Sequence, residues 1–285
     1  MRHLLWYWRA LRQELERARQ VLVLLDFDGT LAPIVEHPGD ARVLPECAAA
    51  LHKLSSVRSC TLGFLSGRPL TELRGLLRLP GCFYAGNCGM EWEGPGFGPL
   101  RVNLPPTVGD QLRTAREMFG REMSSYPGAF VEDKAFSFAV HYRAAPPRLV
   151  PQVEQCLGAL LARVPPGLCV RPGKMAVEIR PAGARDKGNA ARAIVRQVTR
   201  THAVTPLIIL FGDDDCDEPA FEVVSPLGWP VLVGGPKVNS HATCYVEGSH
   251  EVAAFLSRIA DCLHDREVMR AAPGVFQPVE RAAYS

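Results

Sequence analysis

The chain has 285 residues and a formal net charge of +2, with 47% hydrophobic and 22% charged residues. This length is enough for one large core, or for a core that carries a second small domain. A net charge near zero gives no electrostatic reason to expect a nucleic acid or a membrane as partner. No apolar run approaches the roughly 20 residues of a membrane helix. The apolar stretch before Arg9 is shorter than the roughly 7–15 residues of a signal-peptide core.

Nine cysteines are spread along the chain, and no pair has the CxxC spacing that is typical of zinc or redox sites. An odd number of cysteines, in a chain of this size without a secretion signal, argues against a disulfide framework. Most of them stand in apolar surroundings, as Cys60 and Cys169 do. We therefore expect small buried thiols in a protein of the reducing cytoplasm.

The first part of the chain alternates between strands and helices after an amphipathic N-terminal helix. Continuous apolar runs at 21–25, 61–65 and 82–85 predict strands that are buried on both faces, as in a parallel sheet. Apolar residues at helical spacing predict helices that begin at Pro45 and near Leu70. This rhythm predicts an α/β core with a doubly wound parallel sheet.

A different rhythm occupies the middle of the chain. Residues 93–106 are rich in glycine and proline and are predicted to form a linker. The segment 103–181 has the pattern helix, strand, strand, repeated once, which predicts an inserted α+β cap domain. The chain is thereby divided into core residues 1–102, cap residues 103–181 and core residues 182–285.

The core rhythm then resumes. Asp186 is predicted to cap a helix, and a buried strand is predicted at 207–211. Strands at 231–233 and 243–246 and a helix over about 249–262 complete the core. The last twenty residues show no periodic pattern.

Polar residues follow three of the predicted strands at their carboxyl ends, where open parallel sheets bind ligands. The three polar sequences begin at Asp26, Ser66 and Gly212. Converging carboxylates suit a hard cation such as Mg²⁺, which allows several of them to stay ionised close together. Asp26 is then placed to attack phosphorus and form an aspartyl phosphate, with Asp28 as acid and base.

Three further residues fit a phosphate site. Gly29 permits a tight turn, Ser66 can donate a hydrogen bond, and Lys187 adds a positive charge at the start of a helix. Each has an ordinary explanation when it is taken alone, as a turn, cap or surface residue. Their order at the strand ends favours a magnesium-dependent phosphatase.

Taken in order, the motifs DFDGTL, SGR, Lys-Gly and GDDxxDE resemble the four motifs of the haloacid dehalogenase superfamily of phosphatases, over nearly the whole chain. The finer pattern is similar to that of trehalose-6-phosphate phosphatases. The segments that carry this likeness are 26–34, 65–68, 132–134, 141–143, 173–181 and 212–218. Two positions depart from the family pattern, because Cys88 replaces a histidine and Cys216 replaces a threonine. Neither change touches the nucleophile or the metal ligands that the resemblance implies.

The resemblance implies a role for each of several residues. Asp26 would be the nucleophile and Asp28 the acid/base. The Mg²⁺ ligands, directly or through water, would be Asp26, Asp28, Asp213, Asp214 and Asp217. The phosphate would be bound by Ser66, Gly67 and Lys187. A mobile cap would recognise the sugar, with contacts from Arg68, Lys134, Arg143, Lys174 and Glu178.

The activity implied by the resemblance is hydrolysis of trehalose 6-phosphate to trehalose and phosphate. One alternative is a phosphatase of the same fold that acts on another sugar or osmolyte phosphate. A second is a catalytically idle chain that binds a sugar phosphate as a regulator, which the complete set of catalytic residues argues against. The expected partner is a small sugar phosphate, with neither nucleic acid nor membrane. The sequence leaves the oligomeric state open and is compatible with a monomer.

Overall fold

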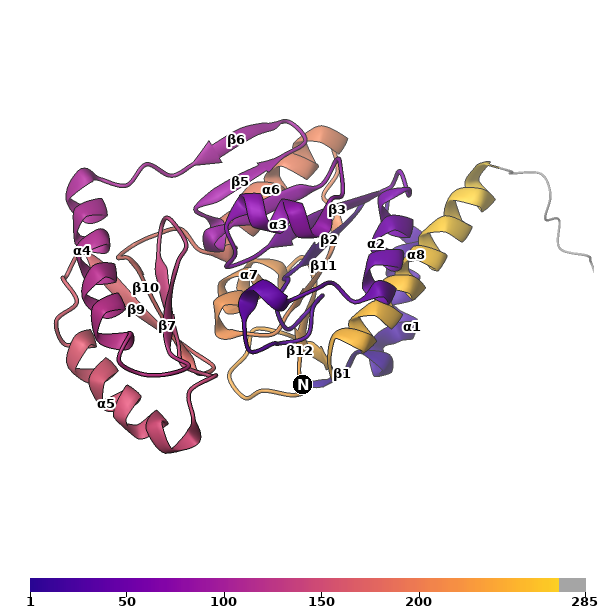
Figure 1. Cartoon of the computed structure of the whole chain (residues 1–285). Helices are drawn as coiled ribbons and strands as arrows, with labels where there is room; N and C mark the ends of the chain where they lie inside the picture. The colour runs from indigo at the N-terminus through magenta and orange to yellow at the C-terminus, as the bar shows by residue number, and fades with distance from the viewer. Residues whose placement is uncertain (272–285) are drawn as a thin grey trace, which may run out of the picture.

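The computed structural model describes residues 1–271, and their strands form two separate sheets (Figure 1). The larger sheet has nine strands in the order β1-β13-β12-β11-β2-β3-β4-β5-β6. These strands are β1 (Arg2–His3), β2 (Val21–Leu25), β3 (Cys60–Leu65), β4 (Phe83–Gly86), β5 (Glu91–Gly94), β6 (Phe97–Arg101), β11 (Leu207–Gly212), β12 (Gly228–Val233) and β13 (Cys244–Val246). Neighbouring strands from β1 to β4 are parallel, whereas β5 and β6 are antiparallel additions at one edge.

Helices cover both faces of this sheet. One face packs against α1 (Leu4–Arg17), α2 (Pro45–Ser55), α3 (Leu70–Leu77) and α8 (Ser249–Ala271), and the other against α6 (Lys187–His202) and α7 (Glu218–Val224). The central strand β2 serves both layers, because Val21, Val23 and Leu25 face the first group and Leu22 and Leu24 face the second. All five side chains are fully buried, as the continuous apolar run predicted. The predicted α/β class with a doubly wound parallel sheet is confirmed.

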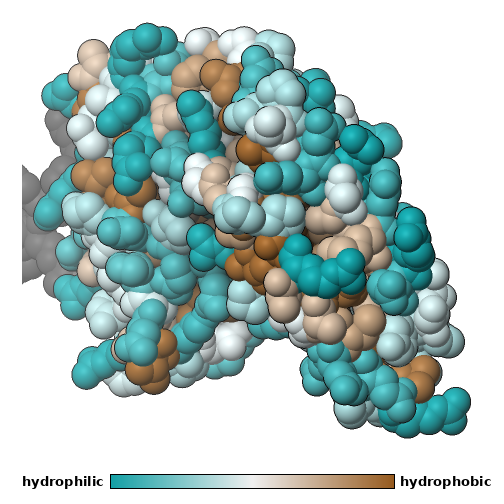
Figure 2. All heavy atoms as spheres, turned by 90° about the vertical axis from the view of Figure 1, so that its left-hand side faces the viewer, coloured by the Kyte–Doolittle hydropathy of each residue, from teal (hydrophilic) through white to brown (hydrophobic). Residues whose placement is uncertain are grey.

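The smaller sheet is antiparallel and has its own apolar core. Its strands, in the order β7-β8-β10-β9, are β7 (Phe130–Asp133), β8 (Phe138–His141), β9 (Leu168–Gly173) and β10 (Ala176–Pro181). Helices α4 (Pro106–Met123) and α5 (Val150–Leu161) cover one face, where the rings of Phe119 and Phe138 meet edge to face at 5.4 Å. Seen from this side of the molecule, the surface is mainly hydrophilic, with small separate apolar patches (Figure 2). The boundaries 103–181 for a cap remain a prediction.

The predicted linker over 93–106 is wrong for most of its length, because this stretch contains the end of β5 and all of β6. The two strands form a hairpin that turns at Gly96, whose φ of +73° is in the region that glycine adopts readily. The ring of Phe97 packs 5.7 Å from Trp92 and 5.6 Å from Phe83. The glycines and prolines of the turn indicated a loop, and the short strands with aromatic residues on either side of it were therefore not predicted.

Helix α8 continues to Ala271, beyond the predicted end near residue 262. The apolar pattern is interrupted by the buried Arg266, whose Nη1 donates to the carbonyls of Leu15 at 2.5 Å and Ala18 at 2.6 Å. The last twenty residues show no periodic pattern, yet they are helical up to Ala271, and residues after it lie outside the described part. None of the helices within residues 1–271 combines the length and the apolar character needed to cross a membrane.

The cysteines were expected to be small buried thiols without disulfides. All nine are free, which confirms the absence of a disulfide framework. Cys47, Cys82, Cys88 and Cys244 are buried as predicted, whereas Cys60, Cys156, Cys169 and Cys262 are only half-buried. Cys216 is exposed, because it stands in the turn that follows β11 and not in a strand or a long helix.

Candidate active site

Asp26 follows β2, in the middle of the larger sheet, and its side chain is bound by a lysine from another element. The Asp26 side chain is almost fully buried, and the Nζ of Lys187 donates to its Oδ1 at 2.6 Å. The same Nζ donates to Asp217 Oδ1 at 2.7 Å. Lys187 is the first residue of α6, which Asp186 caps as predicted by accepting from the amide of Asn189 at 2.9 Å. The two parts of the chain that meet here are 161 residues apart in sequence.

Three carboxylates meet at this point. Asp26, Asp213 and Asp217 each place one oxygen within 4.8 Å of the others. The second oxygen of Asp217 accepts from the backbone amide of Asp213 at 3.1 Å, which fixes the turn. Gly29, with φ +82°, approaches so closely that any side chain there would overlap the Asp213 carboxylate. Within residues 1–271 this cluster is the one group of acidic, histidine or cysteine side chains with the spacing of a metal site.

Burial and mutual repulsion disfavour the ionised forms of these carboxyl groups. Burial raises the pKa of Asp26 well above its usual value, and Asp217 and Asp213 add to the rise although Lys187 opposes it. Burial likewise raises the pKa of Asp213 to about 6, with Asp217 contributing. Burial alone would lower the pKa of Lys187, but Asp217 and Asp26 raise it well above its usual value. Two ammonium groups, the buried Lys187 and the largely exposed Lys174, thus face three acidic groups, an arrangement that suits an additional cation.

Asp214, the remaining predicted metal ligand of this turn, lies outside the cluster of three carboxylates. Its Oδ1 accepts from the amide of Asp215 at 2.6 Å, and its side chain caps the short 3₁₀ helix η4 (Asp215–Asp217). The structure therefore places Asp214 as a cap of the turn that carries Asp217.

Ser66 and Gly67 follow β3, beside Asp26 in the sheet. The Ser66 side chain is fully buried, and its Oγ accepts from the amide of Arg68 at 3.1 Å. The carbonyl of Ser66 accepts from the amide of Cys88 at 2.8 Å. We call residues 66–68 the phosphate loop, after the predicted role of Ser66 and Gly67.

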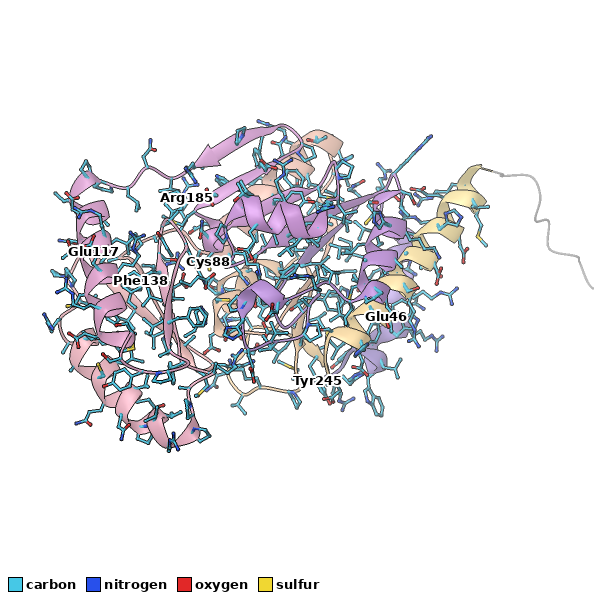
Figure 3. All side chains as sticks on the ribbon, in the orientation of Figure 1. Glu46, Cys88, Glu117, Phe138, Arg185 and Tyr245 are labelled. Carbon is cyan, nitrogen blue, oxygen red and sulfur yellow. The ribbon has the colours of Figure 1, made fainter. Side chains whose placement is uncertain are left out.

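A cavity of about 380 Å³ lies between the two sheets, at the carboxyl ends of the parallel strands. All predicted site residues line it except Ser66 and Asp217, which are buried beneath it. Cys88, one of the two departures from the family pattern, also lines the cavity. It lies on the side of the larger sheet that faces the smaller sheet (Figure 3).

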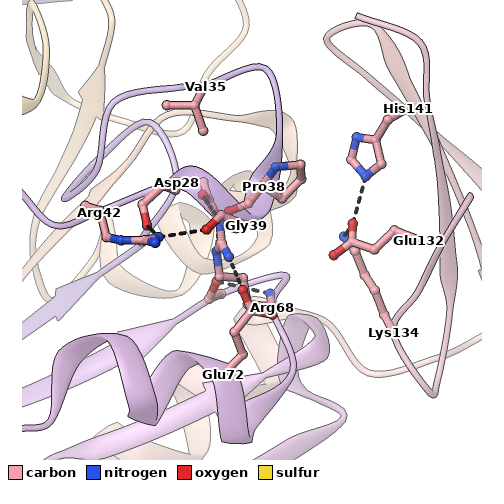
Figure 4. Close-up of polar contacts among 12 residues, drawn as sticks. Asp28, Val35, Pro38, Gly39, Arg42, Arg68, Glu72, Glu132, Lys134 and His141 are labelled. Carbon is pink, nitrogen blue, oxygen red and sulfur yellow. Dashed lines mark hydrogen bonds and ion pairs between the residues drawn. The ribbon is translucent and has the colours of Figure 1, made fainter. Parts of the chain in front are cut away.

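Asp28 lines this cavity, but a buried arginine binds its carboxylate. Arg68 binds it with two hydrogen bonds of 2.7 Å, from Nε to Oδ2 and from Nη2 to Oδ1 (Figure 4). Arg68 is almost fully buried, also contacts Glu72, and donates to the carbonyl of Pro38 at 2.7 Å. The structure thus pairs Arg68 with the acid/base candidate, whereas the sequence predicted that Arg68 contacts the sugar.

The wall formed by the smaller sheet carries a polar network. His141 Nε2 lies 2.7 Å from Glu132 Oε2, and Lys134 Nζ lies 3.8 Å from the same oxygen (Figure 4). Ser137 Oγ donates to Glu178 Oε1 at 2.6 Å. Burial alone would lower the pKa of Lys134, but Glu178 and Glu132 raise it. Burial alone would raise the pKa of Glu132, but the hydrogen bond from His141 and the charge of Lys134 lower it.

Two residues next to strands of the smaller sheet, Arg143 and Lys174, contact the part of the chain that carries the larger sheet. Arg143 donates to the carbonyl of Val35 at 2.9 Å and to that of Lys174 at 2.7 Å. Lys174 Nζ lies 3.4 Å from Asp213 Oδ2, while 64% of the Lys174 side chain is exposed. Of the predicted sugar-binding residues, Lys174 therefore reaches the acidic cluster, whereas Arg143 binds backbone carbonyls.

The sequence reasoning did not single out Glu132 and His141 as site residues, although both line the cavity. A signal was present, because Glu132 and Lys134 are two residues apart, which is the spacing of one face of a strand. In the same way, His141 and Ala139 share a face in β8, and both line the cavity.

The sheet order and the acidic cluster at its carboxyl edge define a protein of the haloacid dehalogenase-like fold. A haloacid dehalogenase-like hydrolase from Bacteroides thetaiotaomicron has this fold with a TM-score of 0.59 at 17% identity, covering 84% of this chain and 99% of that one. The C-terminal domain of the Candida albicans trehalose-6-phosphate phosphatase has a TM-score of 0.77 at 22% identity, covering 89% and 96%.

The sequence pattern of the trehalose-phosphatase family matches residues 24–258, and the chain belongs to this family. The trehalose-phosphate phosphatase of Mycobacterium tuberculosis is 33% identical to it over 251 residues. The aligned region covers 87% of this chain and 63% of that protein. The chain therefore spans less than two thirds of the length of this relative.

Proposed function

We propose that the chain hydrolyses trehalose 6-phosphate to trehalose and phosphate in the cytoplasm, with Mg²⁺ as its cofactor. The observation that carries this proposal is the meeting of Asp26, Lys187 and two further carboxylates at the base of one cavity that many charged residues line. Membership of the family supports a phosphate ester as the substrate. The names of the relatives support trehalose 6-phosphate among sugar phosphates.

The proposed reaction uses two carboxylates. Lys187 holds Oδ1 of Asp26, so the other oxygen attacks phosphorus while the bond from phosphorus to the sugar oxygen breaks. Asp28 gives its proton to the leaving sugar oxygen. A water molecule then attacks the aspartyl phosphate and loses a proton to Asp28, which releases phosphate and restores the Asp26 carboxylate.

The acidic cluster fits Mg²⁺, which prefers carboxylate and carbonyl oxygens. Asp26, Asp213 and Asp217 supply the carboxylates. The Asp213 carboxylate can occupy its place because Gly29 beside it has no side chain. When bound, the cation neutralises charge on the phosphate and favours the ionised form of its ligands. We assign the backbone carbonyl of Asp28 to the same site and leave Asp214 out of the direct ligands.

Recognition of the sugar is assigned to the smaller sheet, as a cap over residues 103–181. A disaccharide offers mainly hydroxyl groups, which need paired donors and acceptors when they are desolvated. The donors and acceptors on this wall of the cavity include Lys134, Arg143, Lys174 and Glu178.

The proposal is tested by phosphate release from trehalose 6-phosphate with and without Mg²⁺, beside a panel of other sugar phosphates. We expect the highest specificity constant for trehalose 6-phosphate, and only with the metal. Faster release from another ester would favour the first alternative, a phosphatase of a different sugar or osmolyte phosphate. Binding of trehalose 6-phosphate without turnover would favour a regulator.

A further inference from the structure

We propose that Glu91 and Arg101 are positioning residues that align the phosphate loop with the tip of the β7–β8 hairpin, residues 133–137. Neither side chain lines the cavity, and nothing in the reaction above uses them. The inference rests on the proposed function, since it concerns the groups that hold the phosphate and the sugar.

The segment between β4 and β5 has an unusual backbone. Asn87, Cys88 and Gly89 all have positive φ, of 48°, 51° and 93°, and two of them carry side chains. Consecutive left-handed residues are unfavourable unless the surroundings hold them. Here the amide of Asn87 donates to the carbonyl of Arg68, and that of Cys88 to the carbonyl of Ser66, both at 2.8 Å. The strained segment therefore supports the phosphate loop directly.

The same segment also supports the start of α6. A side chain at Gly89 would overlap the carbonyl of Asp186, which precedes Lys187. Residues 87–89 thus pack between the phosphate loop, which carries Ser66, and the first turn of α6, which carries Lys187. A shift of the segment would move both groups relative to Asp26.

Glu91 fixes this segment. Its buried carboxylate accepts from Asn87 Nδ2 at 2.7 Å and from the amide of Leu70 at 3.2 Å, both through Oε2. Leu70 is the first residue of α3, and Pro69 before it provides no side-chain cap. One carboxylate therefore holds the strained segment and the helix that follows the phosphate loop.

Arg101 extends this network to the hairpin tip. It binds the other oxygen of Glu91 from Nε at 2.9 Å and from Nη2 at 2.8 Å. Its Cζ lies 5.2 Å from the ring centre of Phe136, which is buried in the tight turn between Lys134 and Ser137. Lys134 lines the cavity and Ser137 binds Glu178. Arg101 thus connects the support of the phosphate loop to the turn that carries the sugar-facing groups.

The two residues should give different kinetic signatures. Glu91→Gln keeps the shape of the side chain but removes its charge, which weakens its hold on the segment that supports the phosphate loop. The phosphate loop should then be misplaced relative to Asp26, whichever ester is bound. Arg101→Ala leaves one oxygen of Glu91 to water, because 67% of the Arg101 side chain is exposed, and it mainly frees the hairpin tip. A small ester that makes no sugar contacts should therefore be affected less by Arg101→Ala than a disaccharide phosphate.

The experiment compares Glu91→Gln, Arg101→Ala and Arg101→Lys with Glu93→Gln as a matched control. Glu93 lies on the same strand and pairs with Arg74 at 2.9 Å, but it contacts neither the phosphate loop nor the hairpin tip. The readouts are kcat and KM for trehalose 6-phosphate and para-nitrophenyl phosphate, the affinity for inorganic phosphate, and the melting temperature.

We expect Glu91→Gln to lower kcat at least tenfold for both esters and to weaken phosphate binding at least threefold. Arg101→Ala should lower kcat/KM at least fivefold for the disaccharide phosphate and less than threefold for the small ester, with partial rescue in Arg101→Lys. Glu93→Gln should change each value less than twofold. Equal behaviour of Glu91→Gln and Glu93→Gln would overturn the role of Glu91. Arg101→Ala that changes only the melting temperature, or both esters equally, would overturn the role of Arg101.

These readouts also separate the inference from the proposed function. If the unmodified protein releases no phosphate from trehalose 6-phosphate, the proposed function fails. The effect of Glu91→Gln on para-nitrophenyl phosphate and on inorganic phosphate then still decides whether Glu91 aligns the phosphate loop. The role of Arg101 is then decided on whichever larger phosphate ester the unmodified protein hydrolyses.

Discussion

Arg68 binds both carboxylate oxygens of Asp28, with two hydrogen bonds of 2.7 Å each. A two-pronged contact of this kind fixes the orientation of the carboxylate and occupies both of its oxygens. The proposed donation of a proton to the leaving sugar oxygen needs an Asp28 oxygen within hydrogen-bond reach of the ester. Asp28 must therefore leave Arg68, or share it with the incoming substrate, before the ester bond breaks. Because 39% of the Asp28 side chain is exposed, it has room to do so.

Asp28→Asn should slow hydrolysis of trehalose 6-phosphate by about 10²- to 10⁴-fold, the usual contribution of an acid/base group. The first step with para-nitrophenyl phosphate should suffer less, because its leaving group needs no proton. Single-turnover kinetics with both esters measure that step separately from hydrolysis of the intermediate. Equal losses in the first step would show that Asp28 does not protonate the leaving group.

Asp26→Asn should abolish turnover and leave the fold intact. Asparagine has almost the same shape as aspartate but is a poor nucleophile, so we expect a loss of roughly 10³-fold or more. Lys187 keeps its second partner, Asp217, and should remain buried and charged. Steady-state rates and circular dichroism of the purified variant check both parts. A variant that keeps more than a tenth of the original rate would refute the assignment of the nucleophile.

Removal of divalent metal should abolish activity, and Mg²⁺ should restore it. Ca²⁺ should inhibit, because its larger and looser shell takes more oxygen ligands than that of Mg²⁺. It can then occupy both oxygens of Asp26, which prevents the attack on phosphorus. Rates in excess chelator, followed by titration with each ion, give the measurement. Full activity in the chelator would exclude a metal-dependent mechanism.

The site residues that could be predicted are those whose position depends only on the neighbouring sequence, such as residues directly after a buried strand. Asp26 and Ser66 each follow a run of buried residues, and parallel strands bring such ends to one edge. The pairing of Asp28 with Arg68 could not be read in this way, because it depends on the packing of two loops that are 40 residues apart. Nor could the contact of Lys174 with Asp213, which joins the two sheets.

The fold, too, was predicted where the local sequence pattern is clear and missed where it is not. Apolar periodicity identified the buried strands of the parallel sheet, since their burial on both faces leaves a continuous run. It failed for β6, which is half-buried or exposed along its length and lies beside a glycine- and proline-rich turn. It also failed at the end of α8, where Arg266 occupies a buried position that an apolar residue would ordinarily mark.

Glu132 should make the smaller sheet more stable at neutral pH than in acid. Its pKa is lowered in the folded state because His141 and Lys134 outweigh the effect of burial. The unfolded chain therefore binds more protons below the ordinary glutamate value near 4.5, and stability rises with pH through that window. The contribution is fully present above about pH 5 and is lost as the pH falls through the lower folded value.

Glu132→Gln tests this sign. The melting temperature of the variant should fall below that of the unmodified protein at pH 7, and the difference should shrink as the pH is lowered toward 4. Glu117→Gln is a suitable control, since Glu117 lies on the exposed side of α4 and, within residues 1–271, pairs only with Arg113 at 3.7 Å. A difference that grows in acid would contradict the lowered pKa.

Glu178→Ala separates recognition of the sugar from the chemistry of phosphate transfer. Glu178 lies on β10, faces the cavity, and has one oxygen bound by Ser137, which leaves the other for sugar hydroxyls. Charge-assisted hydrogen bonds contribute about 1.5–3 kcal/mol each. We therefore expect kcat/KM for trehalose 6-phosphate to fall at least tenfold, while hydrolysis of para-nitrophenyl phosphate changes less than threefold.

Ser137→Ala is the matched variant for this prediction, because it removes the group that orients Glu178 and keeps the carboxylate. It should lower the same specificity constant by a smaller factor and in the same direction. The specificity constants of both variants for both esters, with their melting temperatures, make the comparison. Equal losses on the two esters would place Glu178 in catalysis or in the stability of the smaller sheet. Unchanged kinetics for Glu178→Ala would mean that this face of the sheet is merely solvated. Removal of a carboxylate that binds sugar hydroxyls must lower the specificity constant for trehalose 6-phosphate.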